Sequence, residues 1–349
     1  MGKPSIIWDL GTAYDFFMSL HVLHEPNEWG LRGAWAAGVR SRLSAENRTF
    51  LKESRAVLGI PLYFIHTLPA TKNAQTALDY ITQIPVADRL AEIYALPQYQ
   101  QRNPKRAMLF KQLLTTGRYS ADDVKQLYVL QDKDVRRRSR KENERLAYWL
   151  TQPSEFGTKI LPALTNYFEV FFAEEEVRLQ PFLATGLAKA QELAKSLTLK
   201  TLLEQLSNGV TYSEEKLGKL DTLILAPSFW TTPFVLRGDI TPAFSVYLFG
   251  ARPDSASLVP GEVVPDALYR TLKALADPTR LKIMKYLTVA PHTPTDLAQK
   301  LRLRPPTVIH HLHIMRLAQL VYVHISAEGK RYAARVEAIQ SAMQVLDAF

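Results

Sequence analysis

The sequence predicts a mainly α-helical protein made of two domains. Apolar residues recur three and four positions apart over residues 12–206, strand-like runs replace this pattern over 220–250, and helical spacing returns after Pro265. A length of 349 residues suits about two domains with a sizeable core. We therefore expect a helical N-terminal domain with a small β-sheet, followed by a smaller C-terminal domain.

The composition is that of an ordinary globular protein, with 47% hydrophobic and 22% charged residues. The net charge of +9 favours polyanionic partners without selecting one. The chain has no cysteine, which excludes disulfides, thiolate metal sites and Cys nucleophiles. Asp9 comes too early for a secretory signal, and no apolar run approaches the roughly 18 residues of a membrane span. We expect a cytoplasmic protein without a membrane partner.

The elements of the first domain follow from these periods. We expect helices over 12–24, 28–37, 44–57, 74–83, 87–95, 104–115, 120–150, 160–173 and 179–206. Short strands are expected over 222–226, 234–237 and 245–249, separated by Pro227, Pro233 and Pro242. Either 6–7 or 62–65 is expected to join the sheet that these strands form.

A segment rich in Pro, Gly and Ser separates the two patterned regions. The boundaries expected are therefore a first domain over 1–250, a linker over 251–264 and a second domain over 265–349. From residue 262 onward the chain has 12 Lys or Arg and 7 Asp or Glu, so the basic excess is concentrated there.

The second domain has the pattern of a helix-turn-helix. A helix after Pro265 ends near Ala276, and Asp277 can cap a second helix over 278–287. Thr295 can cap a short third helix to residue 301, and a tight connection leads to a fourth over 305–317. Strands over 321–325 and 330–334 then form a hairpin, or wing, and a last helix starts near Val336.

Two stretches of this domain carry a family resemblance. LKALADPTRLKIMKYL at 272–287 and TVIHHLHIMRLAQLV at 307–321 resemble the ArsR (arsenic-repressor-like) family of bacterial winged helix-turn-helix repressors. The likeness covers about 80 residues, with Ile309 where the family usually has Ser and Gln319 where it usually has Gly. LRGAWAAGVRSR at 31–42 is similar to a subgroup of large ArsR-like regulators with an extended N-terminal domain.

Helical geometry divides the fourth helix into two faces. At 100° per residue Val308, Leu312 and Met315 share one apolar face. The opposite face can enter a major groove, where His310 can donate to or accept from a base edge and Ile309 can pack on a thymine methyl. The residues expected to contact DNA are Pro306, Ile309, His310 and His313 on the outer face, Arg304, Thr307 and Arg316 at phosphates, and Lys330 and Arg331 on the wing.

Other clusters have both a structural and a functional interpretation. His310, His311 and His313 are dense enough to suggest a metal, but a metal on the outer face would block the DNA groove. DNA contact or simple exposure is therefore favoured, and His311 either bonds within its domain or contacts DNA. His21 and His24 lack the metalloprotease order and a third ligand. We expect no metal and no cofactor.

Three further segments of the first domain raise the same choice. The run 131–145 mixes both charges, which favours a solvated helix face over a phosphate-binding patch. Glu174, Glu175 and Glu176 favour a surface, although with Tyr167, Phe168, Phe171 and Phe172 they could line a pocket. Ser228 is expected in a turn rather than as a nucleophile, because no catalytic motif surrounds it.

These observations favour a DNA-binding transcriptional regulator, most simply a repressor that recognises a roughly palindromic operator as a homodimer. A non-metal signal, such as a small-molecule effector, is expected to act on residues 1–250. No enzymatic activity is expected. The alternatives are an enzyme or a protein-interaction scaffold in the first domain, with the second domain directing it to DNA.

Overall fold

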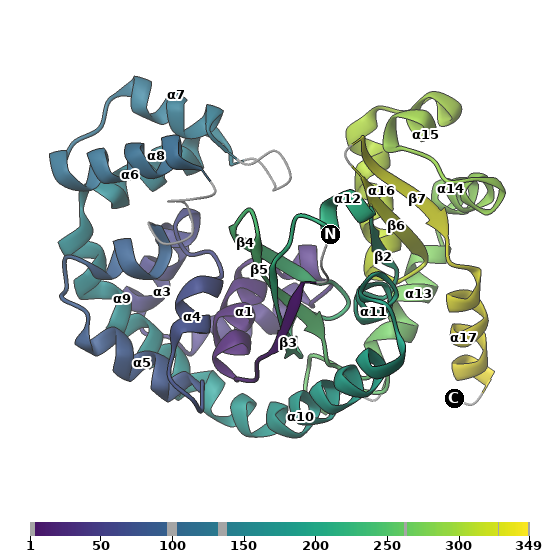
Figure 1. The fold of residues 1–349 in the computed structure, drawn as a ribbon, viewed down its shortest axis with the longest axis horizontal. Helices are drawn as coiled ribbons and strands as arrows, with labels where there is room; N and C mark the ends of the chain where they lie inside the picture. The colour runs from purple at the N-terminus through teal and green to yellow at the C-terminus, as the bar shows by residue number, and fades with distance from the viewer. Residues whose placement is uncertain (1–3, 96–102, 132–137, 262–263, 327, 348–349) are drawn as a thin grey trace.

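The computed structural model describes residues 4–95, 103–131, 138–261, 264–326 and 328–347, and it is mainly α-helical (Figure 1). Helices surround a small sheet in the N-terminal part, and the C-terminal part forms a separate lobe beside it. The N-terminal helices are α1 (Ala13–His24), α2 (Gly33–Ser41), α3 (Ala45–Glu53), α4 (Leu62–Thr67), α5 (Ala74–Gln83), α6 (Pro104–Thr116), α7 (Ala121–Val129), α8 (Arg140–Thr151), α9 (Pro153–Tyr167), α10 (Ala173–Ser196), α11 (Leu199–Leu206) and α12 (Glu214–Leu217). Short 3₁₀ turns η1 (Pro26–Trp29) and η2 (Ser54–Ala56) and π turns η3 (Ala91–Ala95) and η4 (Phe168–Phe172) connect some of them.

The central sheet has the strand order β1-β3-β5-β4. Strands β1 (Ser5–Trp8), β3 (Thr222–Ser228) and β5 (Phe244–Gly250) run parallel, and β4 (Leu236–Thr241) is antiparallel to β5. The prediction that residues 6–7 join the sheet is confirmed, but residues 62–65 form α4 instead. Pro61 precedes α4, and Leu62 and Ile65 lie three positions apart and are both buried, which suits a helix packed on the core.

Several helix boundaries differ from those predicted. The helix expected over 120–150 is two helices, because α7 ends at Val129 and a capping box of Ser139 and Glu142 starts α8. Residues 132–137 of that prediction lie outside the described residues. Helix α9 starts earlier than expected, and Leu197 and Thr198 separate α10 from α11, where the Thr198 side chain caps the new helix.

The C-terminal lobe has the predicted winged helix-turn-helix order. Its elements are α13 (Asp266–Leu275), α14 (Pro278–Val289), α15 (Pro294–Leu301), α16 (Pro305–Leu317), β6 (Val321–Ser326), β7 (Gly329–Ala334) and α17 (Val336–Asp347). Asp277 caps α14 as expected, whereas Thr293 rather than Thr295 caps α15. Arg302, at φ 55°, makes the tight turn between α15 and α16. Buried apolar residues of α13 to α16 form a core of their own, and α17 packs partly buried residues against it.

One strand joins the two lobes and was not predicted. Strand β2 (Val210–Tyr212) pairs in parallel with β6, so the wing is the outer part of a three-stranded sheet of order β2-β6-β7. The Val323 N–H donates to the Gly209 carbonyl at 2.8 Å, and Val210, Tyr212 and Val323 share a second apolar cluster. The N-terminal lobe therefore holds the wing directly.

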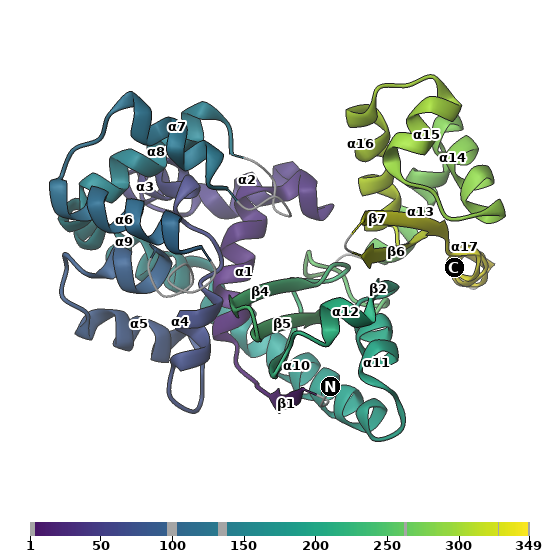
Figure 2. The ribbon, with the colours of Figure 1, turned by 45° about the horizontal axis from the view of Figure 1, so that its top comes forward.

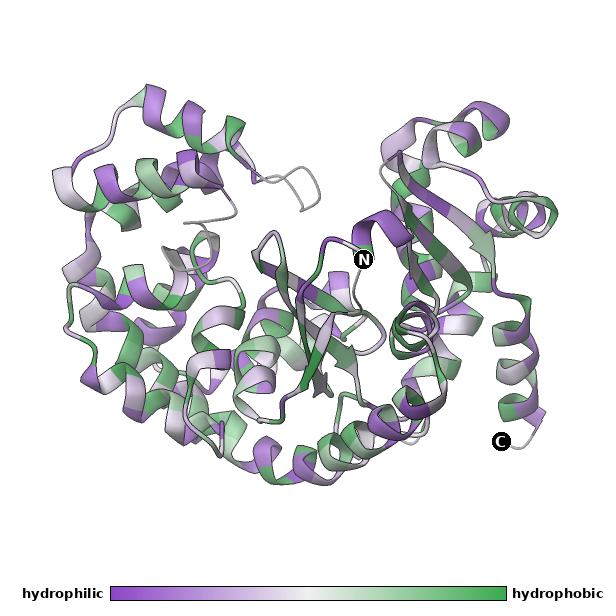
Figure 3. Ribbon diagram, viewed as in Figure 1, coloured by the Kyte–Doolittle hydropathy of each residue, from purple (hydrophilic) through white to green (hydrophobic). Residues whose placement is uncertain are grey.

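Hydropathy follows the layers of the fold. Figure 3 shows hydrophobic residues along the central strands and alternating hydrophilic and hydrophobic residues along the helices. Within the described ranges, no helix is both long enough and apolar enough to cross a membrane.

Candidate nucleic-acid interface

Helix α16 has one buried and one exposed face in its N-terminal half. Val308, Leu312 and Met315 are buried against α14 and α15 in the core of the lobe. The exposed residues of this half and of its N-cap are Arg304, Pro305, Pro306, Thr307, Ile309 and His310. Ile309, the residue that replaces the Ser usual in the resembled family, is 54% exposed, so more than half of this apolar residue faces solvent. The exposed face of this half of α16 is of the kind that can enter a major groove.

The wing contributes two exposed cations. Lys330 pairs with Ile325 and Arg331 pairs with His324 across the hairpin, and both basic side chains are exposed. Because successive side chains of a strand point to opposite faces, Lys330 and Arg331 lie on different faces of the wing. They are therefore placed to follow a phosphate backbone on either side of the hairpin rather than to make one joint contact.

Arg316 has a different environment from the one predicted. Its side chain is only 7% exposed, and its guanidinium donates to the Ser207 carbonyl at 2.6 Å and to the Asn208 carbonyl at 3.0 Å. Burial lowers the pKa of Arg316 to about 10, so the group stays charged at neutral pH. The structure thus assigns Arg316 to the attachment of α16 to the N-terminal lobe, because its donors are directed away from the surface that would meet a phosphate.

His313 also faces the N-terminal lobe rather than open solvent. Its ring stacks on Phe234 with 5.6 Å between centroids, and its Nε2 lies 3.5 Å from a Glu28 carboxylate oxygen. Periodicity placed His313 correctly on the outer face of α16, but it could not show that η1 covers this end of the face. Of the predicted outer residues, the structure groups Pro306, Ile309 and His310 and separates His313 from them.

The exit from α16 depends on a strained residue. Gln319 adopts φ 56°, the left-handed conformation for which Gly is favoured, and its side chain oxygen accepts from Arg335 at 3.3 Å. Arg335 also donates to the Asn208 carbonyl at 3.4 Å. The chain therefore has Gln319 where the resembled family usually has Gly, and the backbone still makes the left-handed turn.

The other histidines considered as metal ligands are His21, His24 and His311. His311 lies on the flank of α16, and burial lowers the pKa of its imidazole. His21 packs edge-on against Trp29, and His24 Nδ1 lies 2.8 Å from the Leu20 carbonyl. Among the residues that the structure describes, no group of three or more His, Cys, Asp or Glu side chains is arranged to hold a metal ion.

Ser228 belongs to a buried network. Its hydroxyl donates to Asp15 at 2.8 Å, and the same carboxylate accepts from the backbone N–H groups of Phe229 and Trp230. Burial raises the pKa of Asp15 to about 7. Ser228 is fully buried, and its hydroxyl oxygen also accepts from the N–H and the hydroxyl of Thr231, so the geometry agrees with a structural role.

The sequence favours a surface position for the three glutamates of α10, but two of them make buried or partly buried contacts. Glu175 is 4% exposed, accepts from the Trp230 indole at 3.0 Å and pairs with Arg178. Glu176 accepts from the Thr12 hydroxyl at 2.5 Å and from the Ala74 N–H at 2.9 Å. These carboxylates tie α10 to α1, α5 and the sheet, a role that periodicity alone does not indicate.

Comparison with known proteins agrees with this geometry. Residues 277–323, which span α14 to the first part of β6, match the model of the arsR family of bacterial regulatory proteins. Over 71 residues the chain is 30% identical to the transcriptional repressor SdpR of Bacillus subtilis (strain 168), a match that covers 20% of this chain and 79% of that repressor. The chain therefore belongs, through its C-terminal lobe, to the arsR family of bacterial regulatory proteins and is a DNA-binding transcriptional regulator.

Proposed function

We propose that this protein is a transcriptional repressor that binds a roughly palindromic operator as a homodimer and responds to a signal received in residues 1–250. The observation that carries this proposal is the exposed N-terminal half of α16 on a fully buried back face. His310 and Ile309 are the residues that would contact bases. Arg304 and Thr307 at the helix start, with Lys330 and Arg331 on the wing, would contact phosphates.

The homodimer is supported by apolar surface on α13 and α17, which pack on each other at the edge of the lobe (Figure 1). A single copy leaves five large apolar side chains exposed there, namely Tyr269, Val336, Met343, Val345 and Leu346. A two-fold pair of lobes joined through this surface would bury them and present two α16 helices. Such a pair would read two related half-sites about 10 to 10.5 base pairs, or a multiple of this, apart.

A signal in the N-terminal lobe is supported by its attachment to α16. Arg316 and His313 lie on α16 and contact residues of that lobe, and β2 extends the sheet of the wing. A shift of η1 or of the segment 207–212 would therefore move the helix and the wing relative to DNA. A small-molecule effector is the simplest such signal, since the cysteine-free chain cannot form a thiolate metal sensor.

Selection of binding sites from random duplex DNA by the purified full chain tests this function. We expect a recovered motif with two inverted half-sites. Recovery of no motif would contradict DNA recognition, and a single asymmetric site bound by a monomer would contradict the homodimer. Transcription from a promoter that contains the motif should fall when the protein is present, and a rise would make it an activator.

A further inference from the structure

A basic groove lies in the N-terminal lobe. It is formed by α2, α3 and α8, which lie together in Figure 2, and it encloses about 930 Å³. Six cationic side chains line it, against two carboxylates, Glu53 and Glu142. The cationic residues are Arg40, Arg48, Lys52, Arg55, Lys141 and Arg145.

Three of the arginines are held in place by neighbouring groups. Arg55 lies between Glu25, at 2.9 Å, and Glu142, at 3.7 Å. Arg145 lies 3.4 Å from Glu53, and the Arg40 guanidinium donates to the Leu23 carbonyl. A guanidinium has five N–H donors, so one such contact fixes its position and leaves other donors for an anion. This part of the groove is therefore preorganised.

The other three cations form an exposed rim. Arg48, Lys52 and Lys141 are solvent-exposed, and none makes an ion pair with any residue that the structure describes. Like charges gathered without carboxylate partners repel one another, and an anion bound among them relieves that repulsion. The charge of the groove thus selects a ligand with more than one negative charge.

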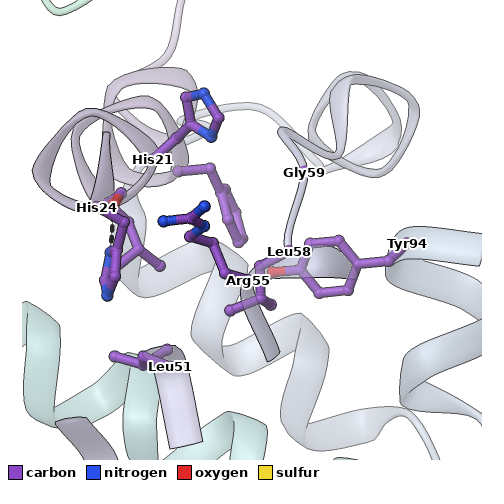
Figure 4. A pocket seen from close by; sticks show the side chains of 9 residues that line it. His21, His24, Leu51, Arg55, Leu58, Gly59 and Tyr94 are labelled. Carbon is purple, nitrogen blue, oxygen red and sulfur yellow. Dashed lines mark hydrogen bonds between the residues drawn. The ribbon is translucent and has the colours of Figure 1, made fainter. Parts of the chain in front are cut away.

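A small cavity adjoins the groove and adds a hydrogen-bond acceptor. His24 and Arg55 line both spaces, and the cavity itself, of about 10 Å³, has room for about one water molecule (Figure 4). A carbonyl only accepts, so the His24 Nδ1–H donates to Leu20, and Nε2 of the neutral ring is an acceptor. This Nε2 is buried and has no partner among the described residues. The site therefore offers guanidinium donors and one acceptor side by side.

We propose that this groove binds a small molecule that carries phosphate groups. The concave shape and the arginines held inside it favour a small ligand over a nucleic acid backbone, which is contacted by projecting side chains. Phosphate oxygens match the arginine donors, and a hydroxyl on the same molecule matches His24 Nε2. From the sequence alone, a phosphate-binding role for the run 131–145 is an open alternative. The proposal assigns that role to two of its residues, Lys141 and Arg145.

The groove also adjoins the contact between the lobes. Glu25, the partner of Arg55, is followed by η1, whose Pro26 lines the groove and whose Glu28 faces His313 of α16. Trp29 of η1 packs on Phe234, on which His313 stacks. A phosphate bound to the free donors of Arg55 would weaken its pairing with Glu25, just before η1, and so alter the contact of η1 with α16. This regulatory consequence rests on the proposed function, whereas binding in the groove does not.

Calorimetric titration of the full chain with pyrophosphate, in the absence of DNA, tests the proposal. We expect saturable binding that weakens at least tenfold in the double variant Arg48→Gln/Lys52→Gln. The control Lys189→Gln/Lys195→Gln removes the same charge from the exposed face of α10 and should bind like the unmodified chain. All four side chains are exposed, so neither variant should change the unfolding midpoint.

Absence of saturable binding at millimolar pyrophosphate, or equal weakening in the two variants, would overturn the proposal. So would a result in which Arg48→Gln/Lys52→Gln leaves pyrophosphate binding intact and weakens binding to a duplex of random sequence tenfold, because the groove would then follow DNA. If the chain binds pyrophosphate as expected and no DNA at all, the proposed repressor function fails and the groove assignment stands.

Discussion

Arg304 and Arg316 lie on the same helix and differ only in their surroundings. Arg304 is exposed at the start of α16, where its guanidinium has no carboxylate partner in the described part of the chain. Arg316 is buried at the other end and donates to two backbone carbonyls of the N-terminal lobe. The sequence predicts both as phosphate contacts. Periodicity indicates on which face of the helix a residue lies, but it does not indicate what covers that face.

The two arginines should therefore respond differently to removal. Arg304→Ala should weaken binding to all duplexes alike, with little effect on stability. The slope of log K against log salt concentration should fall by about the amount that one phosphate contact contributes. Arg316→Ala should leave the salt dependence unchanged and cost about 1–3 kcal/mol of unfolding free energy, because the Ser207 carbonyl loses the Arg316 donor and the Asn208 carbonyl keeps only the longer bond from Arg335. Binding at several salt concentrations, together with urea unfolding, checks both. A reduced salt dependence in Arg316→Ala at unchanged stability would contradict the assignment.

Asp15 should make stability depend on pH in an unusual direction. Burial raises its pKa from 3.8 to about 7, so between these values the folded protein holds a proton that the unfolded chain releases. The contribution of Asp15 to stability is therefore complete below about pH 4 and is lost as the pH rises toward 7.

Asp15→Asn removes this titration. The variant should be less stable than the unmodified protein at pH 4, because the amide cannot accept from the Phe229 N–H while it accepts from Ser228 and Trp230. The difference in unfolding free energy should narrow by several kcal/mol, as an order of magnitude, on going from pH 4 to pH 7. A difference that stays constant over this range, measured by urea unfolding, would show that Asp15 is ionised in the folded state.

At the scale of elements, strand β2 is the least expected feature. Gly209 precedes it at φ 99°, and a Cβ on Gly209 would lie 2.4 Å from a ring carbon of Tyr322 on β6. Any larger residue at 209 would require the Tyr322 ring or the backbone beside it to shift. The pairing of β2 with the wing therefore depends on one residue whose role is not evident from its neighbours in the sequence.

Gly209→Ala tests that dependence, with Gly261→Ala as its matched control. Both glycines have positive φ, so both variants should lose about 1 kcal/mol of stability from backbone strain. Only the side chain at Gly209 meets another group, since nothing lies within 4 Å of a Cβ on Gly261. Gly209→Ala should thus lose clearly more stability in thermal unfolding and expose the segment 207–212 to proteases. Equal losses would mean that β2 and β6 can separate at little cost.

Most elements could be predicted because their signals are local. Apolar periodicity located α1, α5 and α6, and the Asp277 cap located α14, while the turn at Gly329 located the hairpin. The failures had non-local or brief signals. Strand β2 spans three residues and is held by a distant strand, and Leu62 to Ile65 read equally well as a buried strand or a helix turn.

At the scale of the whole molecule, the surface of α13 and α17 should set the oligomeric state. Leu346→Glu places a charge on the exposed apolar surface that we assign to the dimer, and it should yield monomers with lower affinity for a palindromic site. Val289→Glu is the control, because Val289 is 84% exposed at the end of α14, outside that surface. Sedimentation at micromolar concentration checks both variants. If both variants are dimers, the interface does not lie on the surface of α13 and α17.

The arrangement of the two lobes could not be predicted from the sequence. The sequence indicates a helix-turn-helix and an outer face for α16, and the exposure of Ile309 and His310 agrees with that. It does not indicate that η1 covers His313 or that Ser207 and Asn208 hold Arg316, because these contacts join segments about a hundred or more positions apart. Only the folded molecule reveals that the N-terminal lobe contacts α16.

The measurement that tests the central claim most directly is the affinity of His310→Ala and Lys330→Ala for the selected operator and for random duplex. If the exposed half of α16 reads bases, His310→Ala should lose about 1–3 kcal/mol of binding free energy on the operator and little on random DNA. Lys330→Ala, which removes a phosphate contact, should lose as much binding free energy on random DNA as on the operator. Equal losses of His310→Ala on the two duplexes would contradict base recognition by this face of α16.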